Sequence, residues 1–156
     1  MKRKLLPRAV LAAIVLLALP AAADAPRDQY EQFDGDSVLI TDHFTKLDWD
    51  RDAVERSKLF ANTNCSVKPS LGFVGRLPSV KDLLTILDEN PHTEYEGGVL
   101  VTKMIDGDAF ADTPVDLPYW TSTPAGPGKV WVVSFSTGLM EPRSTTTEMA
   151  NARCVR

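Results

Sequence analysis

Aspartate residues gather in two stretches of the chain, and carboxylate oxygens are the ligands that calcium prefers in proteins. The first stretch alternates Asp48, Asp50 and Asp52. A calcium loop of the EF-hand type that started at Asp48 would require glycine at position 53 and glutamate at position 59. The chain has Ala53 and Leu59 there, so this pattern fails. We interpret the first stretch as a strand end followed by carboxylates that cap a helix.

The second stretch begins with Asp106 and Asp108 and continues with Asp112 and Asp116. These residues fall in a segment rich in Asp and Pro that has the composition of a long loop, where oxygen ligands can converge on a hard cation. Asp106, Asp108 and Asp112 are therefore the candidate metal ligands, with calcium as the candidate ion. The alternative, which we favour, is that they are solvated aspartates in turns.

Residues for nucleophilic or acid–base catalysis are few. Ser122 and Ser134 have no histidine or aspartate near them in the sequence that would orient a base, and His43 and His92 stand alone in expected turns. An enzyme needs a nucleophile or a positioned acid and base. We therefore expect no catalytic residues and no cofactor, and we predict that the protein is not an enzyme.

Two cysteines, Cys65 and Cys154, are separated by 89 positions. An even pair of cysteines in an exported chain indicates first a disulfide bond. Closing so long a loop is worth roughly 4–5 kcal/mol in the chain-entropy description. Free buried thiols and a metal site are the alternatives, but zinc requires four ligands at close spacing, and neither histidine lies near a cysteine.

The N-terminal residues have the composition of a signal peptide. Basic residues precede an uncharged apolar run over 9–19, and Pro20 and three alanines follow, so we expect cleavage after Ala23. The apolar run is shorter than the roughly 20 residues of a membrane-spanning helix. We predict an exported protein, periplasmic or extracellular, with no membrane attachment after cleavage.

Removal of residues 1–23 takes away four basic residues and no acidic ones, so the net charge changes from −4 to about −8. A net-acidic domain disfavours nonspecific binding to nucleic acid, anionic lipid or sulfated polysaccharide, because such binding depends on Lys and Arg. The remaining 133 residues fit one domain with a core of its own.

Hydrophobic patterns predict the order of the elements after an irregular lead-in over 24–35. Strands are expected at 38–41, around Leu47 and Trp49, and at 99–102, and helices at about 52–62 and from Val80 until Asn90-Pro91 ends the second one. Ser79 and Asp82 have the spacing of a capping box. Residues 106–118 are an expected long loop.

The clearest strand runs from Lys129 to Phe135. Apolar residues occupy both of its faces, with Trp131 and Val133 on one and Val130 and Val132 on the other, which is typical of a central strand. A turn at Ser136-Thr137-Gly138 would return the chain through Leu139-Met140. A final strand is expected over Ala152 to Val155. Two early helices followed by strands predict an α+β fold.

Three short runs resemble the Lcl C-terminal domain family of exported bacterial domains. They are Arg76-Leu77-Pro78-Ser79, Tyr119-Trp120-Thr121-Ser122-Thr123 and Arg153-Cys154-Val155-Arg156. Looser similarity at Thr41-Asp42 and Leu47-Asp48-Trp49 extends the resemblance to about residues 36–156.

The resemblance implies a C-type-lectin-like fold, with two helices packed on a small, mostly antiparallel sheet and long loops at one end. This fold is shared with formylglycine-generating enzymes, but the chain has no pair of redox-active cysteines near its C-terminus. Calcium-dependent lectins carry a Glu-Pro-Asn-like loop, whereas the nearest run here is Glu141-Pro142-Arg143, whose arginine supplies no oxygen ligand. Sugar binding through calcium is therefore disfavoured.

The function that these observations favour is noncatalytic recognition of a protein or glycan partner through loops over about 103–128. Trp120, Thr121, Ser122 and Arg76 are the candidate ligand-binding residues, although a core position for Trp120 and a helix-anchoring role for Arg76 are the readings that we favour. Arg153 and Arg156 are expected on a strand surface. A structural component of the cell envelope, without a soluble ligand, is the alternative function.

Overall fold

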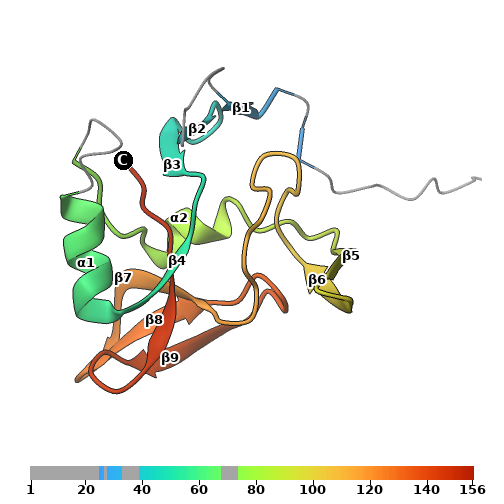
Figure 1. Ribbon diagram of the computed structural model, residues 1–156. Helices are drawn as coiled ribbons and strands as arrows, with labels where there is room; N and C mark the ends of the chain where they lie inside the picture. Colours follow the sequence, from blue (N-terminus) through green and yellow to red (C-terminus); the bar gives the residue numbers. More distant parts are fainter. Residues whose placement is uncertain (1–24, 27, 33–38, 68–73) are drawn as a thin grey trace, which may run out of the picture.

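The structure, a computed structural model, describes residues 25–26, 28–32, 39–67 and 74–156 (Figure 1). The expected signal peptide and most of its cleavage region lie outside these ranges. Within them the chain forms ten strands and two helices. None of these helices is long and apolar enough to cross a membrane.

The elements follow one another in three sheets. The strands are β1 (Tyr30–Gln32), β2 (Leu39–Asp42), β3 (Leu47–Asp50), β4 (Val54–Ser57), β5 (His92–Glu96), β6 (Val99–Lys103), β7 (Tyr119–Gly126), β8 (Lys129–Val133), β9 (Met140–Ser144) and β10 (Met149–Ala152), and the helices are α1 (Lys58–Ser66) and α2 (Val80–Leu84). The sheets have the strand orders β1-β2-β3, β4-β10-β7-β8-β9 and β5-β6. All strand pairs are antiparallel except β7 with β10.

The expected α+β, C-type-lectin-like class is wrong, because the protein is mostly β, with 41% strand and 12% helix. The first predicted helix begins too early: residues 54–57 form β4, which pairs with β10, and α1 starts only after the N-cap Ser57. The pairing strand lies about 90 positions away, so local periodicity could not reveal it. Part of the expected irregular lead-in likewise forms β1.

The second predicted helix is confirmed at its start and is much shorter than expected. Ser79 and Asp82 form the predicted capping box, but α2 has five residues and ends at Leu84. The amide of Thr85 donates to the carbonyl of Asp82, a tight i to i−3 bond that closes the last turn. The chain then leaves the helix, and the amide of Asp88 bonds to the carbonyl of Met104.

Hydrophobic residues pack on both faces of the five-stranded sheet. One cluster contains Tyr119 and Val133 together with side chains of α2 and β3, and the other contains Trp120 and Val132 together with side chains of α1. Helix α1 packs against β4 and β10, and α2 packs against β7 and β8. The alternation along β8 therefore confirms the prediction of a central strand with apolar residues on each face.

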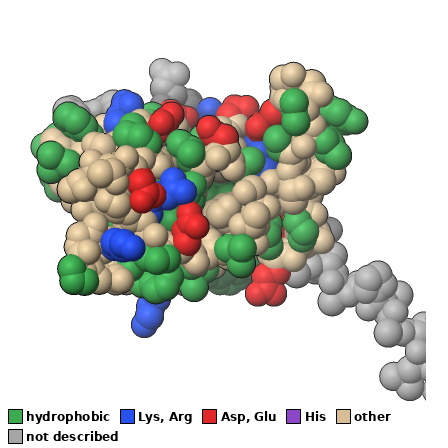
Figure 2. Space-filling view, turned by 90° about the horizontal axis from the view of Figure 1, so that it is seen from below, with side chains coloured by type: hydrophobic (Ala, Val, Ile, Leu, Met, Phe, Trp, Pro, Cys, Tyr) green, Lys and Arg blue, Asp and Glu red, His purple; other side chains and the backbone are tan. Residues whose placement is uncertain are grey.

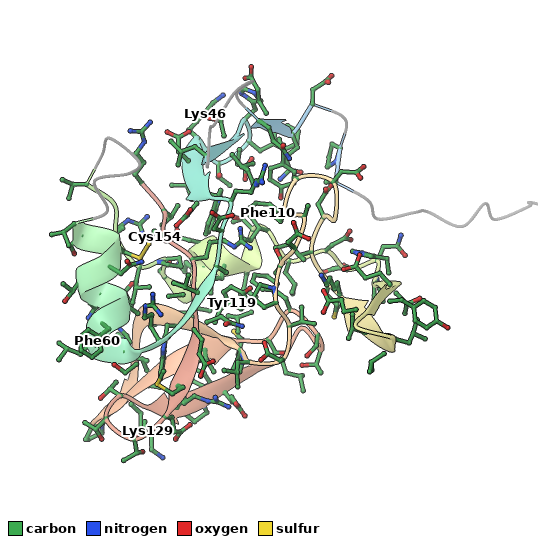
Figure 3. The ribbon with its side chains drawn as sticks, viewed as in Figure 1. Lys46, Phe60, Phe110, Tyr119, Lys129 and Cys154 are labelled. Carbon is green, nitrogen blue, oxygen red and sulfur yellow. A yellow bond between two sulfur atoms is a disulfide. The ribbon has the colours of Figure 1, made fainter. Side chains whose placement is uncertain are left out.

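The predicted disulfide between Cys65 and Cys154 is confirmed, with an S–S distance of 2.14 Å (Figure 3). Cys65 lies inside α1, in its last turn, and not beyond its end. Both cysteines are buried in the cluster under α1. The bond therefore joins the helix directly to the segment that follows β10.

That segment differs from the expected surface strand. Strand β10 ends at Ala152, and Arg153 is fully buried. Its guanidinium donates to the backbone carbonyls of Asp50 and Arg51, at 2.7 and 2.6 Å, and to Oγ1 of Thr113 at 2.7 Å. The prediction of a surface position for Arg153 is therefore wrong. A single sequence gives no signal of the carbonyl acceptors that make burial of this cation affordable.

Replacement of Arg153 by leucine should destabilise the domain severely. The substitution leaves the carbonyls of Asp50 and Arg51 and the Thr113 hydroxyl buried without their donor, a loss of about 3 kcal/mol or more. The control is Arg156→Leu, which removes an exposed ion pair to Asp48 worth at most about 1 kcal/mol. Urea unfolding followed by fluorescence measures both, and equal losses would contradict the structural role of Arg153.

Candidate functional site

The three family-like runs meet in space, beside the start of α2. Strand β7 contacts the run that precedes the helix: the amide of Ser122 donates to the carbonyl of Pro78 at 2.7 Å. The third run joins from the other side, because Arg76 and Val155 exchange backbone hydrogen bonds of 2.9 and 3.0 Å. Residues far apart in the sequence thus build one junction.

Hydrogen bonds at this junction fix the first turn of α2. The Ser79 hydroxyl accepts from the amide of Asp82, whose carboxylate accepts from the amide of Ser79 at 2.8 Å. The amide of Val80 donates to the Thr123 hydroxyl of β7 at 3.0 Å, so a neighbouring strand completes the cap. The Arg76 guanidinium donates to the Asp82 carboxylate at 2.6 Å.

Electrostatics at the cap favour a charged Asp82. Partial burial acts to raise the pKa of its carboxyl, but the hydrogen bonds from Arg76 and Ser79 outweigh burial and hold the pKa below its usual value. The carboxylate is therefore ionised at neutral pH and keeps the turn in place.

A hollow of about 460 Å³ opens beside this turn. Its lining comes from the start of α2, from β7 and from the two strands beyond it, and consists of Ser79, Val80, Lys81, Thr123, Trp131 and Met140. We call it the Trp131 hollow. Trp131 is half-buried, and 46% of Met140 is exposed, so an incoming molecule can reach both side chains.

Strand geometry explains why this surface is open. Trp131 and Val133 lie on the face of the sheet that α2 covers, and Met140 opposes Val133 across the β8–β9 ladder. Val133 is buried in the cluster that contains Leu83 of α2, whereas Trp131 lies beside the helix start and stays accessible. The hollow therefore lies at the start of α2, where the side chain of Trp131 is only partly covered.

The four residues predicted to bind a ligand lie at the junction and not in this hollow. Trp120 is fully buried, and its indole nitrogen donates to the carbonyl of Arg56 at 2.8 Å. Thr121 is fully buried and bonds the carbonyl of Trp131. The Ser122 hydroxyl donates to Pro78 and Arg76 binds Asp82, so these groups connect elements of the fold.

The predicted recognition segment over 103–128 is partly a strand, since it contains β7, and its loop faces inward. Ile105, Phe110 and Val115 belong to the core. Asp106 accepts the amides of Asp108 and Ala109, which makes it a turn residue. In the described ranges no three His, Cys, Asp or Glu side chains are grouped to hold a metal ion, and this includes Asp106, Asp108 and Asp112.

Acidic residues nevertheless gather on this side of the molecule. Tyr30 lines two shallow grooves there, one with Asp88 and one with Asp106. Burial and the nearby carboxylates, Asp42 foremost among them, raise the pKa of Tyr30 far above its usual value. The phenol is therefore a neutral hydrogen-bonding group at every physiological pH.

The histidines are placed apart from the serines that we considered as nucleophiles. His43 contacts Glu31 at 2.9 Å on an exposed strand surface, and His92 lines a shallow groove with Asp88 and Asp106. The Ser134 hydroxyl is paired with that of Ser136. Among the described residues, the hydroxyls of Ser122 and Ser134 thus bond to Pro78 and Ser136 and not to a histidine.

Sequence reasoning missed Lys81, Thr123 and Met140 as lining residues. The signal for Trp131 was present, since an alternating strand must place it on one defined face. The other three come together only because β7 caps α2 and β9 folds back along β8.

The comparisons with known proteins found one match. A family described as the Lcl C-terminal domain matches residues 38–156. No curated protein and no solved structure matches the chain.

Replacement of Asp82 by asparagine should destabilise the protein at neutral pH by about 1 kcal/mol, as loss of a helix cap does. The folded-state pKa of Asp82 is depressed, so its contribution is present above the unfolded value and is lost as pH falls below about 4. The difference in unfolding free energy between the native protein and D82N should therefore shrink with acid.

The matched control for this experiment is Asp112→Asn, at an exposed aspartate outside the cap. Urea unfolding between pH 7 and pH 3 measures all three proteins. A D82N deficit that stays constant over this range would show that the cap does not act through its charge.

Proposed function

This chain belongs to the Lcl C-terminal domain family, and we propose that it is an exported, noncatalytic domain that recognises a partner at the Trp131 hollow. The proposal keeps the expected recognition role but moves it to a hollow whose lining shares only Thr123 with the segment over 103–128. The observation that carries it is an accessible tryptophan at the edge of a mostly apolar hollow, next to the junction of the three family-like runs.

The chemistry of the lining favours an apolar side chain of a protein partner. The volume of the hollow, about 460 Å³, lies within the roughly 300–1,000 Å³ that is typical of binding sites. Trp and Met are enriched at interfaces, because a rigid ring gives a large contact area and an unbranched thioether adapts to its partner. A glycan would stack on Trp131 in the same place, but it would find few polar groups there. A glycan is therefore the second candidate.

Hydrogen-bonding groups at the rim would orient such a partner. The hydroxyl oxygens of Ser79 and Thr123 already accept hydrogen bonds from backbone amides. These bonds restrict the directions in which the two hydroxyl hydrogens can point. Lys81 supplies the single charge among the lining residues. A partner with an apolar anchor and a neighbouring carboxylate matches this arrangement, because opposite charges at an interface rim speed association and fix orientation.

The lining supports a noncatalytic role. Of the six described residues that form it, none is a histidine, a carboxylate or a cysteine, the groups that carry most acid–base and nucleophilic catalysis. The hollow therefore offers contact area and a cation, and it offers no proton acceptor of ordinary strength.

Two observations support export. The N-terminal residues have the pattern of a signal peptide, and Cys65 and Cys154 form a disulfide, which persists in oxidising compartments such as the periplasm and the extracellular space.

The binding proposal predicts that Trp131→Ala weakens partner capture by about tenfold or more, because a central tryptophan is typically a binding hot spot. A photocrosslinking residue replaces Met140 in the purified domain. The domain is mixed with envelope proteins from its native host and irradiated. The expected result is a discrete crosslinked protein that W131A fails to capture.

The control is Phe60→Ala on α1, an aromatic residue that is 66% exposed and points away from the sheet (Figure 3). The same three proteins are applied to a glycan array. If binding depends on Trp131 on the glycan array but not in the crosslinking experiment, the partner is a glycan. If W131A captures the crosslinked protein as well as the native domain does, the hollow has no role in binding.

Export predicts a processed N-terminus. Protein isolated from the native host should begin at Asp24, after cleavage behind Ala23. Its two cysteines should react with an alkylating reagent only after reduction, since they are bonded to each other. Intact-mass spectrometry measures both properties, and a full-length chain with two reactive thiols would overturn the assignment.

A further inference from the structure

The hairpin β5–β6 stands apart from the five-stranded sheet (Figure 1). Its two strands are joined by Gly97 and Gly98, which have φ angles of +57° and +87°, a geometry that favours glycine and matches a tight two-residue turn. In the described part of the chain, each strand of this sheet pairs only with the other. The hairpin therefore has two free edges.

The register shows which backbone groups are free. A two-residue turn places Glu96 and Val99 in a hydrogen-bonded pair, and such pairs alternate with non-hydrogen-bonded ones. Leu100 and Thr102 oppose Tyr95 and Thr93 in the non-hydrogen-bonded pairs. Their N–H and C=O groups therefore point away from β5, along the outer edge of β6.

The composition of β6 suits pairing with another strand. It reads Val-Leu-Val-Thr-Lys, and Val99 and Leu100 are 64% and 57% exposed. β-branched and apolar residues on an edge without proline or an outward charge are what another strand pairs with most readily. Lys103 does not protect the edge, because it is buried and forms ion pairs with Glu94 and Glu96.

The edge strand β9 of the large sheet shows the opposite design. Hydrogen bonds from Ser134 to Leu139 and from Thr145 to Gly128 fix its ladder, so that Pro142 and Ser144 face outward. Pro142 has no N–H, and the amide of Ser144 donates to the Glu148 carboxylate at 3.1 Å. This edge is closed to strand addition, whereas the edge of β6 is open.

A cleft of about 420 Å³ lies beside β6. It is lined by Val101 and Thr102 of the strand, by Glu96 at the end of β5, and by Pro114, Val115, Asp116 and Ser136 from the facing segments. Val115 belongs to the core and gives the cleft an apolar floor. Toward its upper right, on the side where the hairpin lies in Figure 1, Figure 2 shows acidic and hydrophobic side chains next to each other, with a basic side chain beside the acidic ones.

The charges at the cleft select the occupant. Glu96 and Asp116 line it, and none of the described lining residues is basic. Glu96 shares Lys103 with Glu94, so one cation faces three carboxylates and the charge beside the cleft stays negative. A strand that enters it is therefore favoured if it carries Lys or Arg beside its apolar residues. A second copy of this chain is disfavoured, because symmetric pairing of β6 with β6 would bring two sets of these carboxylates together.

We propose that the free edge of β6 binds an extended, basic peptide segment of another protein, which adds to the hairpin as a third strand. Backbone hydrogen bonds to Leu100 and Thr102 hold the segment, an alternate apolar side chain contacts Val101 and Val115, and a lysine or arginine meets Glu96 or Asp116. This is the β-strand addition mode of peptide recognition. The site is separate from the Trp131 hollow and does not depend on it.

The test uses the mature domain and a labelled probe, acetyl-KTVTVK-amide, with the same peptide N-methylated at both valines as its control. The N-methyl groups remove backbone donors but keep the side chains. Saturating probe should slow amide hydrogen exchange at Leu100 and Thr102 at least about tenfold, and the N-methylated peptide should not.

Matched variants separate the two edges of the hairpin. Thr102→Pro removes an outward donor from β6 without touching the β5–β6 ladder, as Pro142 does in β9, and should abolish binding of the probe. Thr93→Pro makes the same change on the outer edge of β5 and should leave binding intact, as should Trp131→Ala.

Several results would overturn the proposal. They are equal binding of the N-methylated peptide, unchanged binding by T102P, or no slowing of exchange at Leu100 and Thr102. Sedimentation that shows a dimer sensitive to T102P would identify a second copy as the occupant instead. If near-UV circular dichroism shows that T102P does not fold, the N-methylated peptide and the variant Glu96→Gln provide the test. E96Q should weaken binding of the probe several-fold at low salt.

Discussion

A buried cation holds this fold together. Arg153 is fully enclosed, and a buried charge without hydrogen-bond partners is strongly destabilising. Its two terminal nitrogens donate to protein oxygens, while its Nε is buried without an acceptor among the described residues. The guanidinium binds the end of β3 and the loop at Thr113, and it lies over the ring of Phe110 at 4.8 Å from the centroid. Burial lowers the pKa of Arg153, and the neighbouring Tyr119 and Asp50 oppose that shift. The small sheet, the inward-facing loop and β7 are thus fixed to one residue.

The adjacent disulfide extends this connection to α1. Cys154 joins the helix on one face of the five-stranded sheet, while Arg153 and Val155 contact elements on the other. Three consecutive residues therefore link α1, the five-stranded sheet and the elements on the other face of that sheet (Figure 1). The two surfaces proposed for recognition are ones that the elements do not cover: the Trp131 hollow beside the start of α2, and the free edge of β6.

The two surfaces proposed for binding differ in the groups that they present. The Trp131 hollow presents side chains, an indole and a thioether with one lysine, and its selectivity is a matter of shape and apolar contact. The β6 edge presents backbone groups flanked by carboxylates, so its selectivity depends on an extended conformation and positive charge.

The sequence by itself determined the features that depend on neighbouring residues. The Ser79–Asp82 capping box, the central strand at β8, the turn before β9 and the pairing of the only two cysteines were all predictable, because caps and alternation act within a few residues. The tertiary structure decided the rest. Whether residues 54–57 extend or coil depends on β10, and whether Arg153 is exposed depends on carbonyls about 100 positions earlier. Burial and strand pairing are set by partners distant in the sequence, and local patterns carry no record of them.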